Sequence, residues 1–253
     1  MTTTPKPPAP PKLIGHRGVA AYAPENTIAG IHAAADMGLE WVCLDVKITQ
    51  DGVAVLFADD LLTRTTGAGG ALGDTSLAAV SELDAGSWFG ESFINERVPT
   101  LEDALDVVNS RGLYPVLVLR PSPGHEIDTA EAALDAATRI WPEDEAPPMI
   151  VSASHVSLET CRDMLPEWPR GLLVEEHSEN WPEVCDYLEI TSLHLVDNAL
   201  SRDDVEEYVE SQLPIVCHVV NDARRAQDLL RWGVDSLVTD QPDVVRESIE
   251  RFH

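Results

Sequence analysis

The chain carries three informative segments near its start: "LIGHRG" at 13–18, "APENT" at 23–27 and "LDVKITQDG" at 44–52. The first is a short apolar run that ends in His16 and Arg17, and a helical pattern follows it. A buried strand that passes through polar residues into a helix is the repeating unit of parallel α/β folds, in which active sites lie at the carboxyl ends of the strands. These segments therefore predict both a fold class and the edge of the fold where a site would lie.

The same alternation continues along the chain. Apolar runs of strand length occur at 13–15, 40–46, 114–120, 149–152, 171–175, 190–195, 214–220 and 236–239. Helical patterns follow at about 27–37, 101–110, 127–140, 157–165, 179–187, 203–211, 222–232 and 242–252. Eight strand–helix units predict a closed (β/α)8 TIM barrel, a fold of about 250 residues that would use nearly the whole chain.

Three helix starts and one long connection stand out. Thr100, Ser157 and Ser201 each precede a helical pattern and are expected to cap it. Residues 59–99, between the second strand and its helix, form a connection long enough to suggest a functional role. We expect this insertion to be a cap over the barrel, with residues 1–12 as a disordered Pro-rich tail and 13–253 as the barrel domain.

Composition limits the classes of partner. The chain has 44 acidic and 17 basic residues and a net charge of −27, which disfavours binding to nucleic acid and to anionic membrane surfaces. No apolar run approaches the roughly 20 residues that span a bilayer. The N-terminus lacks the apolar stretch of a secretory signal, and the four cysteines have no metal-site spacing. We therefore expect a cytoplasmic protein with free, buried thiols.

Further segments carry a family resemblance: "LTRTTGAGG" at 62–70, "VPTLEDAL" at 98–105, "VVN" at 219–221 and "GVDSLVTDQPDVV" at 233–245. With the opening segments, their order and spacing resemble the glycerophosphodiester phosphodiesterases. The resemblance implies a TIM barrel that cleaves glycerophosphodiesters into glycerol 3-phosphate and an alcohol. It also implies a divalent cation, Mg²⁺ or Ca²⁺, and two histidines as general acid and base.

The chain departs from this family pattern at the expected active site. The first family histidine corresponds to His16, but the second falls on Ala58. The family cation ligands fall on Cys43, Asp45 and Val118, so that only Asp45 keeps a hard oxygen donor. The family lysine falls on Arg120. We therefore expect no tightly bound cofactor and weak or absent metal-dependent activity.

Other residues at the strand ends leave alternatives open. Arg17 and Arg120 could bind a phosphate or another anion, or they could pair with carboxylates such as Asp45 inside the mouth. Glu25 and Asp59 could contact the substrate, or they could join Asp45 in a displaced cation site. Asn26, like its neighbour Thr27, could contact the ligand or merely cap the first helix.

Three residues with rings have functional and structural interpretations. His218 stands where the resemblance places a pocket-lining tryptophan, so it could contact a ligand or replace the missing acid, or it could be a core histidine. His194 is a weaker candidate of the same kind. Trp88, in the 59–99 insertion, is expected to pack in the core of the cap, with contact to a substrate alcohol as the secondary interpretation.

Three functions follow from these observations. The first is a catalytically impaired family member that binds a small phosphorylated or anionic molecule at the barrel mouth. The second is an active phosphoric diester hydrolase with a rebuilt site, for which the retained His16, Arg17, Glu25, Asp45 and Asp59 are the evidence. The third is a structural or protein-interaction barrel. The sequence does not specify an oligomeric state.

Overall fold

The computed structural model describes residues 5–197 and 200–250. Within them, a nine-stranded sheet closes on itself through the pairing of its first strand with the second, which confirms the predicted (β/α)8 barrel. The barrel strands are parallel, and one short edge strand, β3, runs antiparallel to β2. The strands are β1 (Leu13–His16), β2 (Trp41–Ile48), β3 (Ala54–Leu56), β4 (Tyr114–Leu119), β5 (Met149–Ser152), β6 (Arg170–Val174), β7 (Ser192–Val196), β8 (Ile215–His218) and β9 (Ser236–Thr239).

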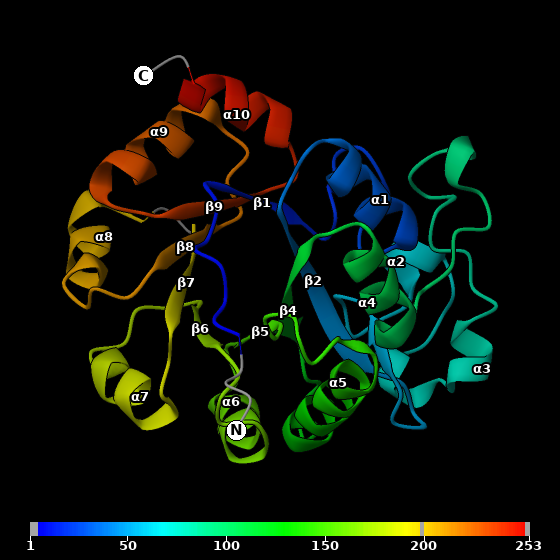
Figure 1. Cartoon of the computed structure of the whole chain (residues 1–253). Helices are drawn as coiled ribbons and strands as arrows, with labels where there is room; N and C mark the ends of the chain where they lie inside the picture. The colour runs from blue at the N-terminus through cyan, green and yellow to red at the C-terminus, as the bar shows by residue number, and fades with distance from the viewer. Residues whose placement is uncertain (1–4, 198–199, 251–253) are drawn as a thin grey trace.

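The helices that follow the barrel strands surround the barrel (Figure 1). They are α1 (Ile28–Asp36), α4 (Leu101–Ser110), α5 (Glu126–Ile140), α6 (His155–Met164), α7 (Trp181–Leu188), α8 (Arg202–Val209), α9 (Ala223–Trp232) and α10 (Pro242–Glu250). Thr100 and Ser201 cap α4 and α8 as predicted. The cap predicted at Ser157 is wrong: Ser154 accepts from the Ser157 N–H, because α6 begins two residues before the predicted start.

Alternation along the strands divides the apolar residues into two layers. Tyr114, Val116 and Val118 of β4 face the barrel interior, whereas Leu117 and Leu119 pack against the helices. A parallel strand that is buried on both faces needs such a continuous apolar run. The same alternation turns the last inward residue of several strands toward the open carboxyl end of the barrel, which we call the mouth.

The 59–99 insertion has a small core of its own. It contains α2 (Thr63–Thr66), α3 (Leu77–Val80) and the 3₁₀ turns η1 (Leu72–Asp74) and η2 (Glu91–Phe93). The core also includes Val55 of β3, a strand that the sequence patterns did not predict because three residues carry no period. The prediction that Trp88 packs in the core of the cap is wrong. Trp88 is 43% exposed, and its ring meets the Phe89 ring edge-on, outside this core.

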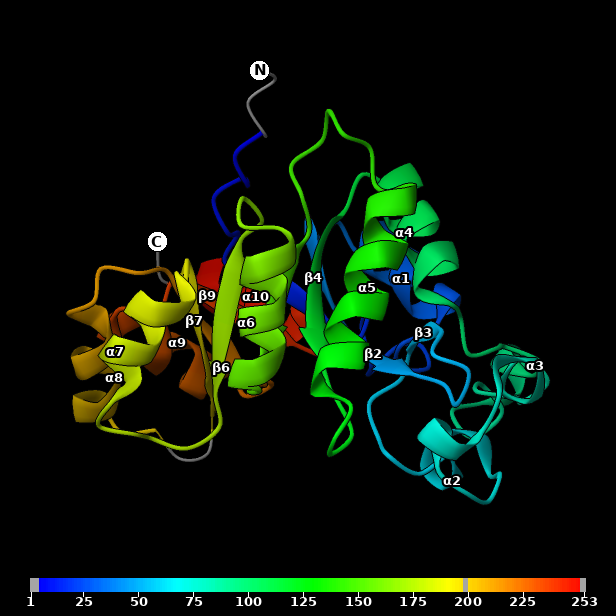
Figure 2. The same ribbon diagram turned by 90° about the horizontal axis from the view of Figure 1, so that it is seen from below.

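The N-terminal segment and the insertion lie at opposite ends of the barrel (Figure 2). The end opposite the mouth has a cavity of about 730 Å³, lined by Lys6–Pro10 of the N-terminal segment together with Trp41, Met149, Trp168 and Arg170 among others. Residues 1–4 of the predicted tail fall outside the described part of the chain. Within the described part, no helix combines the length and hydropathy needed to cross a bilayer.

Candidate active site

The turn after β1 brings the first polar residues to the mouth. Gly18 has a φ of +92° and lies against Gly30 of α1, where an added Cβ would meet the Gly30 backbone at 2.5 Å. Arg17, with a φ of +53°, is held in the left-handed region while its N–H donates to the Cys43 carbonyl oxygen. The close approach of β1, β2 and α1 thus requires this turn. Arg17 and Gly18 therefore have a structural role that is independent of catalysis.

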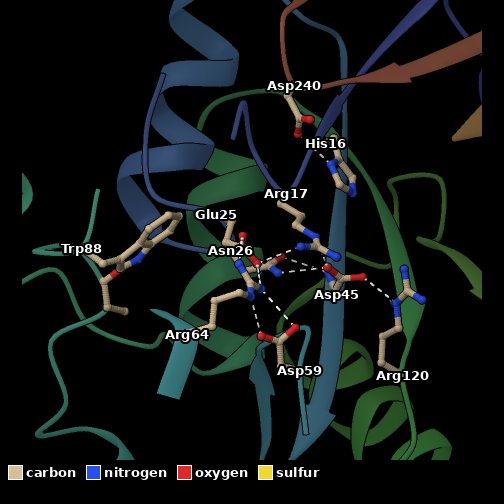
Figure 3. A network of polar contacts seen from close by, with 11 residues as sticks. His16, Arg17, Glu25, Asn26, Asp45, Asp59, Arg64, Trp88, Arg120 and Asp240 are labelled. Atoms are coloured by element: carbon tan, nitrogen blue, oxygen red, sulfur yellow. Dashed lines mark hydrogen bonds and ion pairs between the residues drawn. The ribbon is translucent and has the colours of Figure 1, made fainter. Parts of the chain in front are cut away.

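The mouth contains a continuous series of ion pairs, which we call the mouth ion-pair chain. Three guanidinium groups alternate with four carboxylates in the order Asp59, Arg64, Glu25, Arg17, Asp45, Arg120 and Glu175. Figure 3 shows most of these side chains converging beside the end of β2. The sequence predicted five members as site residues but did not single out Arg64 or Glu175.

Asp45 lies at the centre of this chain. Its Oδ1 accepts from Arg120 Nε at 2.9 Å, and its Oδ2 is 2.6 Å from Arg17 Nε and accepts from Asn26 Nδ2 at 3.0 Å. The side chain is 3% exposed. Burial alone would raise the pKa of Asp45, but Arg17 and Arg120 outweigh that effect and hold the pKa well below its usual value. Asp45 is therefore a charged carboxylate with both oxygens already engaged.

The contact between Arg17 and Asp45 is ionic rather than a good hydrogen bond. The two atoms are 2.6 Å apart, yet the buried Arg17 Nε has no aligned hydrogen-bond acceptor. Distance alone suggests a strong bond, but the strength of an N–H···O bond falls steeply when the donor points away from the acceptor. Arg17 Nη1 makes a better aligned bond to Glu25 at 2.8 Å.

Arg64 connects the cap to the barrel. It comes from α2 and donates two bonds to Glu25, both at 2.7 Å, and two to Asp59, at 2.6 and 3.1 Å. The hydrogen bonds that Arg64 donates to Glu25 and Asp59 raise its pKa, so that its positive charge is permanent. Its segment, "LTRTTG", was recognised in the sequence, but nothing local indicated that the arginine would reach Glu25.

His16 is oriented by a residue from the far end of the chain. His16 Nδ1 is 2.7 Å from Asp240 Oδ1 across 224 sequence positions, and Asp240 also accepts from Asn221 Nδ2 at 2.7 Å. Burial would raise the pKa of Asp240, but the bonds from His16 and Asn221 lower it, so the carboxylate is ionised and can only accept. Nδ1 of His16 therefore carries the proton, and its Nε2 is the nitrogen that can act at the mouth.

The residues at the family cation position do not fit a divalent cation. Cys43 and Val118 belong to the apolar cluster inside the barrel, and burial raises the pKa of the Cys43 thiol, which keeps it neutral. Asp45 has its oxygens bound to arginines and to Asn26. Mg²⁺ and Ca²⁺ need about six oxygen ligands. In residues 5–197 and 200–250, no group of three or more His, Cys, Asp or Glu side chains is placed to hold a metal ion.

A cavity of about 570 Å³ opens beside the ion-pair chain. Ala58, where the resemblance places the second family histidine, lines it together with Arg120, Lys47, Asp59 and Glu175. Lys47 is itself paired with Asp60 at 2.7 Å. The cavity is smaller than the one at the opposite end, but Arg120, which could contact an anion, lines it.

The remaining predicted residues are also placed. Thr27 caps α1, whereas Asn26 bonds Asp45 through both its amide nitrogen and its amide oxygen. His218 lies at the end of β8, 6% exposed, and contacts His194. All four cysteines lie within the described residues, and each is free and buried as expected.

Comparisons with known proteins agree with this geometry at the level of the whole chain. The sequence profile of the Glycerophosphoryl diester phosphodiesterase family matches residues 16–244. The chain belongs to this family. A Bacillus subtilis protein, YhdW, provisionally named a glycerophosphodiester phosphodiesterase, is 32% identical over 92% of this chain and 96% of its own length. A Caldanaerobacter subterraneus glycerophosphodiester phosphodiesterase is 29% identical, covering 92% of this chain and 95% of the relative.

A solved structure of similar shape contains a product. It is an Oleispira antarctica phosphodiesterase in complex with the product sn-glycerol-3-phosphate, with a TM-score of 0.90 and 33% identity over 95% of this chain and 97% of that one. The fold and the family are thus established for this chain, and its function is glycerophosphodiester phosphodiesterase-like. The ligands and the reaction depend on the residues at the mouth.

Proposed function

We propose that this family member binds a small phosphorylated molecule of the glycerol phosphate class at the mouth, and that metal-dependent hydrolysis of glycerophosphodiesters is weak or absent. One observation carries the proposal: Asp45, the hard cation ligand that remains at the family position, is paired on opposite oxygens with Arg17 and Arg120. The two guanidinium groups occupy the oxygens that a cation would need. Guanidinium N–H groups are also the donors that bind phosphate oxygens.

Binding of a phosphate would proceed by exchange of partners. Arg120 is 32% exposed beside the mouth cavity and presents a planar fork suited to phosphate oxygens. The poorly aligned Arg17 Nε has a donor that an anion oxygen could use better than Asp45 does. A phosphate that replaces Asp45 on Arg17 loses little hydrogen bonding at that position, because only the Arg120–Asp45 pair is well aligned.

Hydrolysis lacks more than one contribution. His16 can transfer one proton through Nε2, but the opposite position is Ala58. A missing general acid or base typically lowers the rate by about 10²–10⁴-fold. A cation that would offset the developing charge on phosphorus has no cluster of ligands in the described residues, and Glu25, Asp45 and Asp59 are bound to arginines.

A second candidate is an active hydrolase that releases glycerol 3-phosphate and an alcohol. The comparisons favour it, because relatives across the whole chain are named as glycerophosphodiester phosphodiesterases and the 33% identical structure holds a reaction product. The His16–Asp240 pair is its residue-level support. The four changed mouth positions favour the binding function, and they are the reason we place it first.

One experiment separates the candidates. Release of glycerol 3-phosphate from glycerophosphodiesters is measured with Mg²⁺, Ca²⁺ and Mn²⁺, beside the melting shift that glycerol 3-phosphate induces. The binding function predicts a shift without turnover, lost in Arg120→Gln but kept in Arg202→Gln, whose residue forms an exposed pair on α8. Metal-dependent turnover abolished by His16→Ala would establish the hydrolase. Neither turnover nor a shift would favour the structural or interaction barrel.

A further inference from the structure

A row of hydrogen-bonded side chains crosses the barrel interior below the mouth. His218 Nε2 is 2.8 Å from His194 Nδ1, and His194 Nε2 is 3.1 Å from the Ser192 hydroxyl oxygen. Ser192 in turn lies 3.3 Å from the Met149 sulfur. The histidines come from adjacent strands, β7 and β8, and are 1% and 6% exposed. No step of the proposed function uses this row.

Both imidazoles are neutral near pH 7. Burial lowers the pKa of His194 to about 3 and that of His218 well below its usual value. A neutral imidazole carries one proton, on one of its two nitrogens. The contact between His194 Nδ1 and His218 Nε2 must therefore contain a single proton, which belongs to one ring or to the other.

The two arrangements use the row differently. If His194 carries that proton, its Nε2 needs the Ser192 hydroxyl hydrogen, and the sulfur of Met149 receives no bond. If His218 carries it, His194 Nε2–H donates to the Ser192 oxygen, and the hydroxyl hydrogen is left for Met149. The second arrangement satisfies all three contacts, and a fully satisfied buried network is the more stable one. It leaves His218 Nδ1 without a proton.

The free nitrogen faces the mouth. His218 continues the inward alternation of Val216 on β8, and Asp45, Arg120 and His16 act on it electrostatically. The hydrogen bonds of the described residues leave Nδ1 without a partner. Arg120, which acts on the ring electrostatically, offers a position for a phosphate, so Nδ1 is an acceptor that the rest of such a ligand could reach.

We propose that His218 Nδ1 accepts a hydrogen bond from a ligand hydroxyl, so that the mouth selects a phosphorylated polyol over a phosphorylated simple alcohol. Ser192 and His194 are positioning residues that fix the His218 tautomer. This inference rests on the proposed binding of a phosphorylated molecule. It assigns recognition of the hydroxyl to a histidine that stands where the family resemblance places tryptophan.

The tautomer is tested first, in the ligand-free protein. Histidine ¹⁵N spectra at pH 7.5 distinguish protonated from unprotonated ring nitrogens, and the signals of His218 are assigned by their loss in His218→Phe. We expect a proton on Nε2 of His218. Ser192→Ala removes the acceptor of the His194 Nε2–H, and should move the His218 proton to Nδ1, since an orphaned buried donor is less tolerable than an orphaned acceptor. A proton on Nδ1 of wild-type His218 would overturn the proposal.

Ligand preference is tested next, by calorimetry with glycerol 3-phosphate and propyl phosphate. The wild type should bind glycerol 3-phosphate about threefold to tenfold more tightly, the range expected for one neutral hydrogen bond. His218→Phe should abolish that ratio while keeping propyl phosphate binding, and His32→Phe, at an exposed position on α1, should leave it unchanged. Equal affinities in the wild type refute hydroxyl recognition. If neither compound binds, the proposed function and with it hydroxyl recognition fail, while the spectra still decide the tautomer.

Discussion

Replacing Asp45 by Asn is expected to lower the free energy of unfolding by about 3 kcal/mol, the lower end of the range for breaking a buried ion pair. Asp45 is 3% exposed and neutralises Arg17 and Arg120, which are 19% and 32% exposed. Asparagine keeps the size of the side chain and can still accept from Asn26, so the change removes mainly charge. The lower end applies because solvent reaches both arginines and each keeps a second carboxylate, Glu25 or Glu175.

Thermal unfolding provides the assay. A loss of about 3 kcal/mol lowers the melting temperature of a chain of this length by roughly 6–12 °C. The control is Glu206→Gln, which breaks an exposed pair with Arg202 on α8 and should change stability by about 0.5 kcal/mol or less. Glycerol 3-phosphate should stabilise Asp45→Asn more than the wild type, because the ligand no longer competes with a carboxylate for the two arginines.

The dependence on pH gives a second signature. The folded-state pKa of Asp45 lies well below the usual aspartate pKa of about 3.9, so its contribution is present above about pH 4 and is lost as the pH falls below that value. The stability gap between wild type and Asp45→Asn should therefore narrow only in acid. Equal melting temperatures for Asp45→Asn and Glu206→Gln would refute the reasoning, as would a ligand shift no larger in Asp45→Asn than in the wild type.

Three further outcomes are expected. His194 and His218 are neutral in the folded protein but protonate near pH 6.5 in the unfolded chain. The free energy of unfolding measured in urea should therefore fall from about pH 6.5 downward, by at most about 2.7 kcal/mol per pH unit. A free energy of unfolding that does not change between pH 7.5 and 5 contradicts their burial as neutral rings. Millimolar Ca²⁺ or EDTA should leave the melting temperature unchanged, and a micromolar calorimetric dissociation constant lost in Asp45→Ala would disprove this. Release of glycerol 3-phosphate should need the substitutions Cys43→Glu, Ala58→His and Val118→Glu together, because the rate effects of groups that act as a unit do not add. A single substitution that restores turnover would be contrary evidence.

Local sequence was sufficient for the fold. The apolar runs such as "VLVL" at 116–119 are hydrophobic on both faces, a pattern that local periodicity records, and eight of them separated by helices leave few arrangements other than a barrel. The helix starts at Thr100 and Ser201 were equally local, because a cap bonds an N–H three residues away. β3 and the true start of α6 escaped prediction because too few residues distinguished them from their surroundings.

The sequence by itself also determined which side chains stand where the family resemblance places the site groups. They are His16 and Ala58 at the two histidine positions, and Cys43 and Val118 at two of the cation positions. Only the tertiary structure decided how the retained charges are paired. Arg120 and Asp45 had two interpretations until β2 and β4 were seen side by side, with the two side chains in contact across 75 positions. Arg64 reaches Glu25 through the packing of the cap, and Asp240 reaches His16 through closure of the barrel. Such contacts depend on strand order and register, which bring distant residues together and leave no trace in the local pattern around either partner.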